Sequence, residues 1–346
     1  MKTIFYLVLL FSLVQAEETW ISYEVEREGL TGYKDAQGKI KIEAKFAYAP
    51  SQFLNIVGVV EKKGDEYLDY YLFKNGTKVP DQLYFFDNSP DCESEGTIRF
   101  KQENKIGILD KNAKVLIPAE YSVLTPMKNH MTIVLKGAEK MCHNGREYSN
   151  SNRCEHPRFV GGRSFLMNDR HEVLIEDFDY PYDISLYDFV INDKNISYET
   201  RDNFKDINGN YYAFLNYKKE FTLWLHKVFI PDVLKGEMKK HIFKKLPEKE
   251  YKQLTSSQTE HNVTKLVADI KSHKSFIVSD SLTIYDNENN MLDRYFDTCN
   301  HVKELEYPGF SFILDYRDTN REYYQKRVSF FRSEDGYKLT NIYLGK

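Results

Sequence analysis

The sequence lacks the short motifs that usually indicate catalysis. It contains no Gly-x-Ser-x-Gly nucleophile turn, no phosphate-binding loop, no dinucleotide-binding fingerprint and no His-Glu-x-x-His metal pair. Its 9 histidines are scattered along the chain without a metal-binding spacing. We therefore assign no catalytic residue and expect neither a cofactor nor a metal.

An excess of charge of one sign is also missing. Lysine and arginine number 48 against 52 aspartates and glutamates, which leaves a net charge of −4. This balance argues against nucleic acid as a partner, because nucleic-acid-binding domains usually carry a basic surface. The acidic stretch at 176–179 lacks the spacing of a calcium-binding loop, so we interpret it as a solvated turn rather than as a metal site or paired catalytic carboxylates.

Long apolar runs are missing beyond the N-terminus. Residues 4–14 are mostly apolar, Lys2 precedes them and Ala16 follows them. Spanning a bilayer takes roughly 20 apolar residues, so this run is too short for a membrane anchor. It fits a signal peptide over 1–16, with an exported mature chain that starts at Glu17.

The sequence does contain a repeat. The full pattern is an apolar residue, Asp three residues before Gly, and an aromatic residue eight after that Gly. The first unit has all four, Tyr33, Asp35, Gly38 and Phe46. The second has Tyr71, Gly76 and Tyr84 without the Asp, and the third has Ile108, Asp110, Ala113 and Tyr121, with Ala in place of Gly. The turn positions Gly38, Gly76 and Ala113 are 38 and 37 residues apart. A fixed period of this length predicts stacked supersecondary units.

The chemistry of the unit predicts a β-hairpin. Asp at the start of a turn accepts hydrogen bonds from backbone N–H groups, and Gly at its end tolerates a positive φ. Ile40 and Ile42 alternate with lysines after the first turn, as expected for a strand with one buried face. Because a lone hairpin is marginal in water, neighbouring hairpins must stack to bury that face.

Weaker copies of the unit continue along the chain, with turn positions at His171, Gly209, Asn289 and Gly336. We therefore expect a mainly β protein, in which tandem hairpin repeats stack into an elongated or solenoid-like array. Residues 17–180 hold the regular repeats, and 181–346 hold degenerate ones.

A helical stretch near 232–272 interrupts the repeats. Apolar residues every four positions predict one helix that ends at Pro247 and a second helix after a loop at 255–257: Leu234, Met238, Ile242 and Leu246, then Val263, Leu266, Val267 and Ile270. The first stretch is rich in lysine. Lys239, Lys240, Lys244 and Lys245 either touch an anionic surface or form an ordinary solvated face.

The four cysteines suit an exported protein with disulfides. Between Ala113 and His171 the interval grows to 58 residues, and the insertion contains Cys142 and Cys154. We expect these two to form a disulfide. The alternative is a zinc site made of Cys142, His143, Cys154 and His156, although this spacing matches no strong zinc motif. Cys92 and Cys299 are candidates for a second pair.

The third unit resembles the WG-repeat family, whose unit reads approximately Lys-Trp-Gly-Tyr-Ile-Asp-x-x-Gly-Lys-x-Val-Ile-Pro-x-x-Tyr/Phe. The matching residues are Lys105, Gly107, Asp110, Lys114, Ile117, Pro118 and Tyr121, whereas Ile106 stands at the family's Trp. The resemblance is clear over 17–180 and faint beyond. It implies a bacterial, strand-rich repeat protein and supplies no catalytic residue.

Together these features predict an exported, non-enzymatic binding or scaffold protein of the bacterial envelope, periplasmic or secreted. Its partner would be a protein, a peptide or a glycan. Two alternatives stay open: a hydrolase of envelope polymers with its site in 181–346, and a secreted effector that displays the lysine-rich segment.

Overall fold

The structure, a computed structural model, is mainly β, as the sequence predicts: strands make up 49% of the chain and helices 15%. It describes residues 18–86, 89–149, 151–152, 154–155, 157–179, 183–272, 277–280, 294–303, 305–317 and 323–344. The predicted signal peptide (1–16) and the predicted turn at Asn289 lie outside these residues. No helix in the described part is long and apolar enough to cross a membrane.

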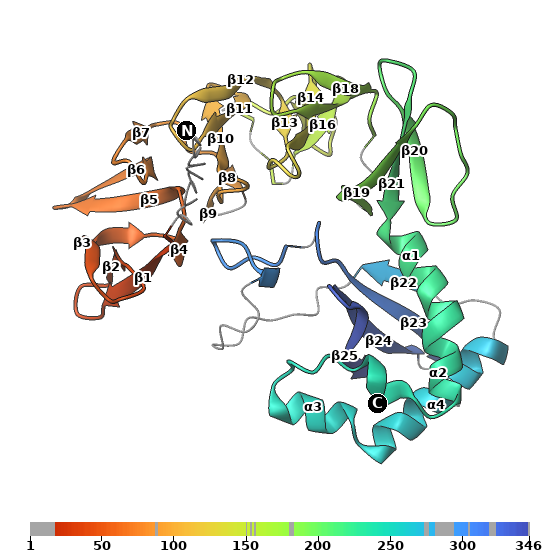
Figure 1. Ribbon diagram of the computed structural model, residues 1–346. Helices are drawn as coiled ribbons and strands as arrows, with labels where there is room; N and C mark the ends of the chain where they lie inside the picture. The colour runs from red at the N-terminus through yellow and green to blue at the C-terminus, as the bar shows by residue number, and fades with distance from the viewer. Residues whose placement is uncertain are drawn as a thin grey trace, which may run out of the picture.

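The sheets follow one another along a curled half-barrel (Figure 1). The first sheet is antiparallel and has the strand order β4 (Gln52–Phe53), β1 (Trp20–Val25), β2 (Leu30–Lys34), β3 (Ile40–Tyr48), β5 (Ile56–Lys63), β6 (Glu66–Phe73) and β7 (Lys78–Pro80). A small ribbon of β8 (Phe85–Phe86) and β9 (Ser89–Pro90) leads to the next sheet.

Three smaller antiparallel sheets continue the curve. They are β10 (Thr97–Gln102), β11 (Lys105–Asp110) and β12 (Val115–Tyr121); then β13 (Val123–Leu124), β14 (Met131–Lys136), β17 (Arg163–Asn168) and β18 (Val173–Glu176); then β19 (Ile184–Asn192), β21 (Tyr211–Asn216) and β20 (Arg201–Lys205). The strands β15 (Glu139–Met141) and β16 (Arg158–Val160) form a separate two-stranded ribbon.

The C-terminal part is a helix-covered sheet. Its antiparallel strands are β22 (Ile277–Asp280), β23 (Gly309–Arg317), β24 (Tyr323–Ser333) and β25 (Gly336–Tyr343). The helical elements are α1 (Tyr217–Trp224), the π-helical turn η1 (Leu225–Phe229), α2 (Ile230–Leu234), the 3-10 turn η2 (Met238–His241), α3 (Glu248–Leu254) and α4 (Ser257–Ser272). Phe221, Phe229 and Leu266 on the helices share one core with Phe310 and Phe330 on the sheet.

Side-chain hydrogen bonds close the predicted turns in the same way in successive units. Asp35 Oδ1 accepts bonds from the backbone N–H groups two and four residues further on, at 3.1 and 2.8 Å. Asp110, Asn168 and Asp206 accept the same pair of bonds. The last position of each turn has a positive φ: Gly38, Ala113, His171 and Gly209. The turn predictions at these four places are confirmed.

The repeat anchors form the cores between neighbouring units. Tyr33, Phe46, Tyr71 and Ile108 are fully buried. One cluster joins the first sheet to β10 and β11, a second joins β11 and β12 to β14 and β17, and a third joins β14, β17 and β18 to β19 and β21. Successive sheets thus share apolar cores along a curled half-barrel, and the regular solenoid-like array expected from the sequence is not seen among the described residues.

The helical prediction was partly wrong. Residues 263–270 lie in α4 as expected, but the segment from Leu234 to Leu246 is not one helix. The helix α2 ends at Leu234, Gly236 has φ +78°, and Ile242 forms a parallel bridge to Leu339 of β25. Pro247 precedes a helix, α3, instead of ending one. The four-residue spacing reflected burial against the sheet, since Met238 and Ile242 are buried.

A stretch that we call the central segment (294–303 and 305–308) lies inside the curve of sheets (Figure 1). The carbonyl of Thr298 accepts bonds from Ser51 Oγ and Gln52 N–H. Further along, Glu306 pairs with Lys128 at 3.1 Å, and Tyr187 donates a bond to it at 3.4 Å. One short segment near the C-terminus therefore contacts successive parts of the curve.

Candidate functional site

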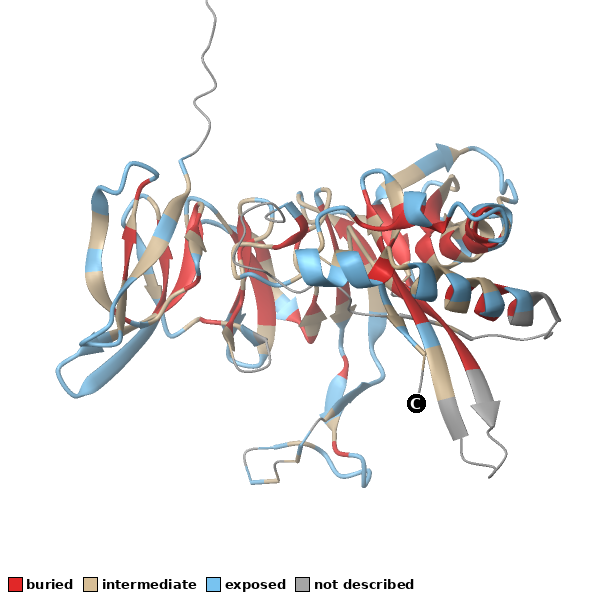
Figure 2. Ribbon diagram, turned by 90° about the horizontal axis from the view of Figure 1, so that it is seen from below, coloured by how far each residue is buried: buried red, intermediate tan, exposed pale blue. Residues whose placement is uncertain are grey.

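The insertion after the third unit forms an arm, which we define as residues 138–162. Its base is β15 paired with β16, and the arm extends away from the rest of the chain (Figure 2). At its base, a Cβ on Gly162 would lie 2.7 Å from both Ala138 N and Lys136 O. Only glycine fits there without a shift of the backbone, so Gly162 marks a close crossing of two strands.

The two predicted cysteines of the arm meet. The sulfur atoms of Cys142 and Cys154 lie 2.02 Å apart, and 12 residues separate the two cysteines in sequence. Sulfur held in a disulfide is no longer a thiolate and does not bind zinc. The alternative zinc set therefore does not form in this structure, and its fourth member, His156, lies outside the described residues.

The arm presents apolar side chains to solvent. Phe159 and Val160 on β16 are 37% and 40% exposed. The ammonium group of Lys140 lies 5.3 Å from the ring centroid of Phe159 and 5.7 Å from that of Tyr148, so a cation covers part of the aromatic surface. The outer edge of β15 is already bonded within the arm, because Tyr148 N–H donates to the Lys140 carbonyl at 2.9 Å. Among the described residues β16 has no strand partner other than β15, and such an edge can pair with another chain.

The lysines of the predicted anionic contact do not form an unpaired cluster. Lys239 pairs with Glu260 at 3.2 Å, and Lys240 pairs with Asp232 and Glu237 at 2.7 and 2.8 Å. Lys244 and Lys245 are exposed. Because acidic partners neutralise at least two of the four lysines, the attraction to an anionic surface is weaker than the sequence suggests.

An acid–base pair lies under the helices. His241 Nε2 is 2.8 Å from Asp232 Oδ2, and both side chains are buried. Trp224 and Phe229 pack edge-on against the imidazole. Burial lowers the pKa of His241 despite the opposing effect of Asp232, so the imidazole is neutral at pH 7. Aromatic rings pack against the imidazole and Lys240 binds the carboxylate, which suits a structural role better than acid–base chemistry on a large substrate.

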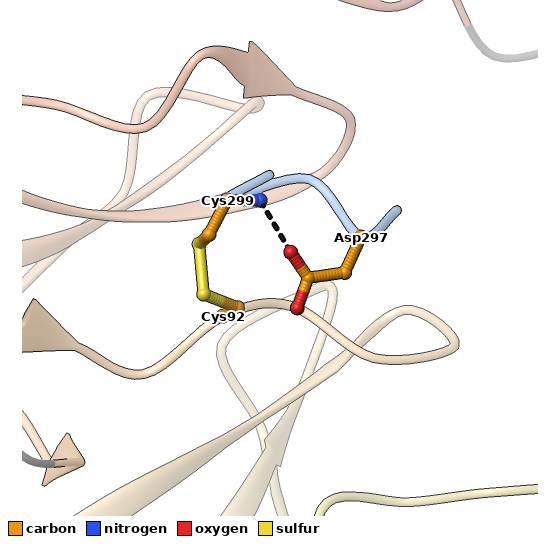
Figure 3. Close-up of side chains that lie close together, drawn as sticks. All are labelled: Cys92, Asp297 and Cys299. Carbon is orange, nitrogen blue, oxygen red and sulfur yellow. Dashed lines mark hydrogen bonds between the residues drawn. A yellow bond between two sulfur atoms is a disulfide. The ribbon is translucent and has the colours of Figure 1, made fainter. Parts of the chain in front are cut away.

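The second pair of cysteines joins the loop between β9 and β10 to the central segment. Cys92, between β9 and β10, is bonded to Cys299 of the central segment, 207 residues away (Figure 3). The Asp297 carboxylate lies beside both sulfurs, and its Oδ1 accepts a bond from Cys299 N–H at 2.9 Å. His301 Nδ1 is 3.7 Å from Cys92 Sγ. We call this group, Cys92, Asp297, Cys299 and His301, the clasp.

Sequence reasoning missed the clasp as a cluster, although a local signal for it exists. Asp297 Oδ1 accepts bonds from the N–H groups of Cys299 and His301, both at 2.9 Å, and Asn300 has φ +68°. This is the turn of the repeat units, with Tyr295 two residues before Asp297 as Tyr33 is before Asp35. A search for Asp and Asn three residues apart would have found it.

Comparison with known proteins adds no relative. No protein-family model matches the chain, and neither a curated protein nor a solved structure shows significant similarity to it. The class that the fold defines is thus a mainly β protein with several antiparallel sheets and a helix-covered C-terminal sheet. The two disulfides are compatible with an oxidising location outside the cytoplasm.

Proposed function

We propose that this chain is an exported, non-enzymatic binding protein of the bacterial envelope, built on WG-like repeats, and that the arm carries its contact surface. The observation behind the proposal is the arm itself. It leaves the stacked hairpins, its own disulfide closes it, and it exposes Phe159 and Val160. A ribbon this small has marginal stability on its own, so the disulfide holds the exposed surface in one conformation.

The chemistry of the arm favours a polypeptide partner. A free strand edge offers main-chain hydrogen bonds to an extended segment, and alternate side chains such as Phe159 supply apolar contact. The charged residues next to it, Glu139, Lys140 and Arg158, are exposed and of mixed sign, so the arm has no single charge that would select a polyanion. Binding to a glycan or to an anionic lipid is therefore treated as an alternative result of the experiment below.

The WG-like repeats have a scaffold role in this proposal. Their anchors are buried and their turn residues are engaged in backbone hydrogen bonds. The alternative, a hydrolase with its site in 181–346, gains little support from Asp232 and His241, because both are buried. The second alternative, a secreted effector that displays the lysine-rich segment, also gains little support, because Lys239 and Lys240 already have acidic partners.

In the experiment, the wild type and two double variants serve as bait to capture partners from an envelope extract of the source organism. In the first, F159S/V160S, the arm loses its exposed apolar groups and keeps its disulfide. The matched control is I40S/V115S. The sequence predicts Ile40 on the buried face of its strand, but Ile40 and Val115 are 47% and 59% exposed at equivalent places of two repeat units. We expect the wild type and the control to capture the same polypeptide, and F159S/V160S to capture it at least tenfold less.

Three results would contradict the proposal: equal capture by both double variants, binding only to vesicles of anionic lipid, or release of soluble fragments from an envelope polymer. The last result would establish the hydrolase alternative. Far-UV circular dichroism of both variants confirms that any loss of capture is not a loss of fold.

A further inference from the structure

The clasp gathers four groups that could all bind one metal ion. The ligand atoms of Cys92, Asp297 and Cys299 lie within 4.8 Å of one another. His301 Nδ1 is 3.7 Å from Cys92 Sγ and 3.6 Å from Asp297 Oδ2, so a fourth donor lies beside two of these groups (Figure 3 shows the first three). Two cysteines, a histidine and a carboxylate are a ligand set that tetrahedral zinc accepts.

The turn of the central segment fixes three of these groups in place. Asp297 N–H donates to the His301 carbonyl at 2.8 Å, and Asn300 N–H donates to the Asp297 carbonyl at 3.0 Å. Asp297 Oδ1 holds two further N–H groups, which leaves Oδ2 for another partner. None of these bonds involves a sulfur atom, so the arrangement of Asp297, Cys299 and His301 does not depend on the disulfide.

The groups of the clasp are also accessible. Cys92, Asp297 and Cys299 are each partly exposed, and the His301 side chain is 58% exposed. A reductant and a metal ion can therefore reach the site without opening a core. In the oxidised protein the sulfurs cannot serve as ligands, because only a thiolate binds the metal.

We propose that reduction of the Cys92–Cys299 disulfide by a dithiol converts the clasp into a zinc site. The dithiol transfers two electrons and becomes a disulfide, and Cys92 and Cys299 each become a thiol. Zn²⁺ then displaces the two thiol protons and binds both sulfurs, His301 Nδ1 and the Asp297 carboxylate. The ion would keep the β9–β10 loop tied to the central segment after the covalent bond is gone. This inference does not depend on the proposed function.

The test uses the C142S/C154S variant, so that the clasp holds the remaining two cysteines. The protein is reduced with a phosphine, freed of reductant without air and titrated with Co²⁺. We expect one Co²⁺ per chain, with a thiolate charge-transfer band and the intense visible bands of tetrahedral coordination. Zn²⁺ should then displace the cobalt, and the oxidised protein should give neither signal.

Substitutions within the clasp show which groups bind. H301A and D297N should each weaken Co²⁺ binding at least tenfold, and C92S/C299S should abolish the charge-transfer band. Asparagine keeps the turn, as Asn168 does in its own unit, so D297N removes the carboxylate alone. The control is H261A, because His261 is an exposed histidine on α4.

The proposal fails if the reduced protein binds no cobalt, shows only octahedral spectra, or binds equally after H301A. If reduction unfolds the chain, Zn²⁺ must restore the far-UV circular dichroism of the oxidised protein, and a lack of restoration also overturns the proposal.

Discussion

Among single residues, those at the last position of each repeat turn are the most constrained, because the backbone there has a positive φ. Three turns use Gly38, Gly76 and Gly209 there, but the third unit has Ala113 at φ +62°. Side chains in this left-handed region are strained by about 1 kcal/mol. We expect A113G to raise the free energy of unfolding by about 1 kcal/mol in urea denaturation.

The control for that substitution is A36G. Ala36 is exposed in the equivalent turn of the first unit and has no positive φ. Glycine there only adds freedom to the unfolded chain, so A36G should lower stability by about 0.5 kcal/mol. A stabilising A36G, or a neutral A113G, would show that backbone strain is not the reason.

Also at the residue scale, Glu61 makes stability depend on pH. Partial burial alone would raise the pKa of Glu61, but bonds from Tyr70, Lys78 and Lys45 outweigh it and lower the pKa to about 2. Between pH 4.5 and 2 the unfolded state therefore binds more protons than the folded state, and stability falls as the pH falls. E61Q should reduce the loss of unfolding free energy between pH 6 and pH 3 by about 1–2 kcal/mol.

The matched substitution for E61Q is E66Q, on the exposed part of the same hairpin. Urea denaturation of each variant at the two pH values gives the comparison. If E66Q changed the pH dependence as much as E61Q does, the hydrogen bonds of Glu61 would not be its cause.

Among the structural elements, the arm contains two neighbouring glycines at its base that have different structural roles. Gly161 and Gly162 both have positive φ, but a Cβ on Gly161 would meet nothing within 4 Å, whereas one on Gly162 would meet backbone. Both alanine variants carry the strain of the left-handed region, about 1 kcal/mol. G162A should cost at least about 2 kcal/mol more, because the strands at the base must move apart.

Urea unfolding gives both values, and hydrogen exchange at β14 and β17 shows where the protection is lost. Equal effects of G161A and G162A would mean that the close crossing at the arm base is relaxed in solution.

How far apart in sequence the interacting residues lie decides how much of the fold could be predicted. The turns were predictable because Asp35, Asp110 and Asp206 bond to backbone only two and four residues away. The helix α1 was missed because Tyr217 fitted the repeat pattern as an aromatic anchor, whereas Asn216 caps a helix there. The pairing of Cys92 with Cys299 depends on how all the intervening units curve, which no local pattern encodes.

At the scale of the whole molecule, the two disulfides differ in the length of chain they close. In the chain-entropy model, a loop of 207 residues is worth about 5 kcal/mol and a loop of 12 about 3 kcal/mol. C92S/C299S should therefore lower the unfolding free energy more than C142S/C154S does, measured by urea denaturation without zinc or reductant. The opposite order would indicate that the curve holds together without its clasp.

The clasp also sets an order of events for a newly made chain. Ribosomes deliver the N-terminus first, so Cys92, Cys142 and Cys154 emerge long before Cys299 does. During that interval Cys92 has no native partner, and an oxidant that joins cysteines as they appear would pair it with Cys142. If the arm disulfide closes first, Cys92 stays available for Cys299; if it does not, thiol–disulfide exchange must correct the early pair, and such exchange takes seconds to hours.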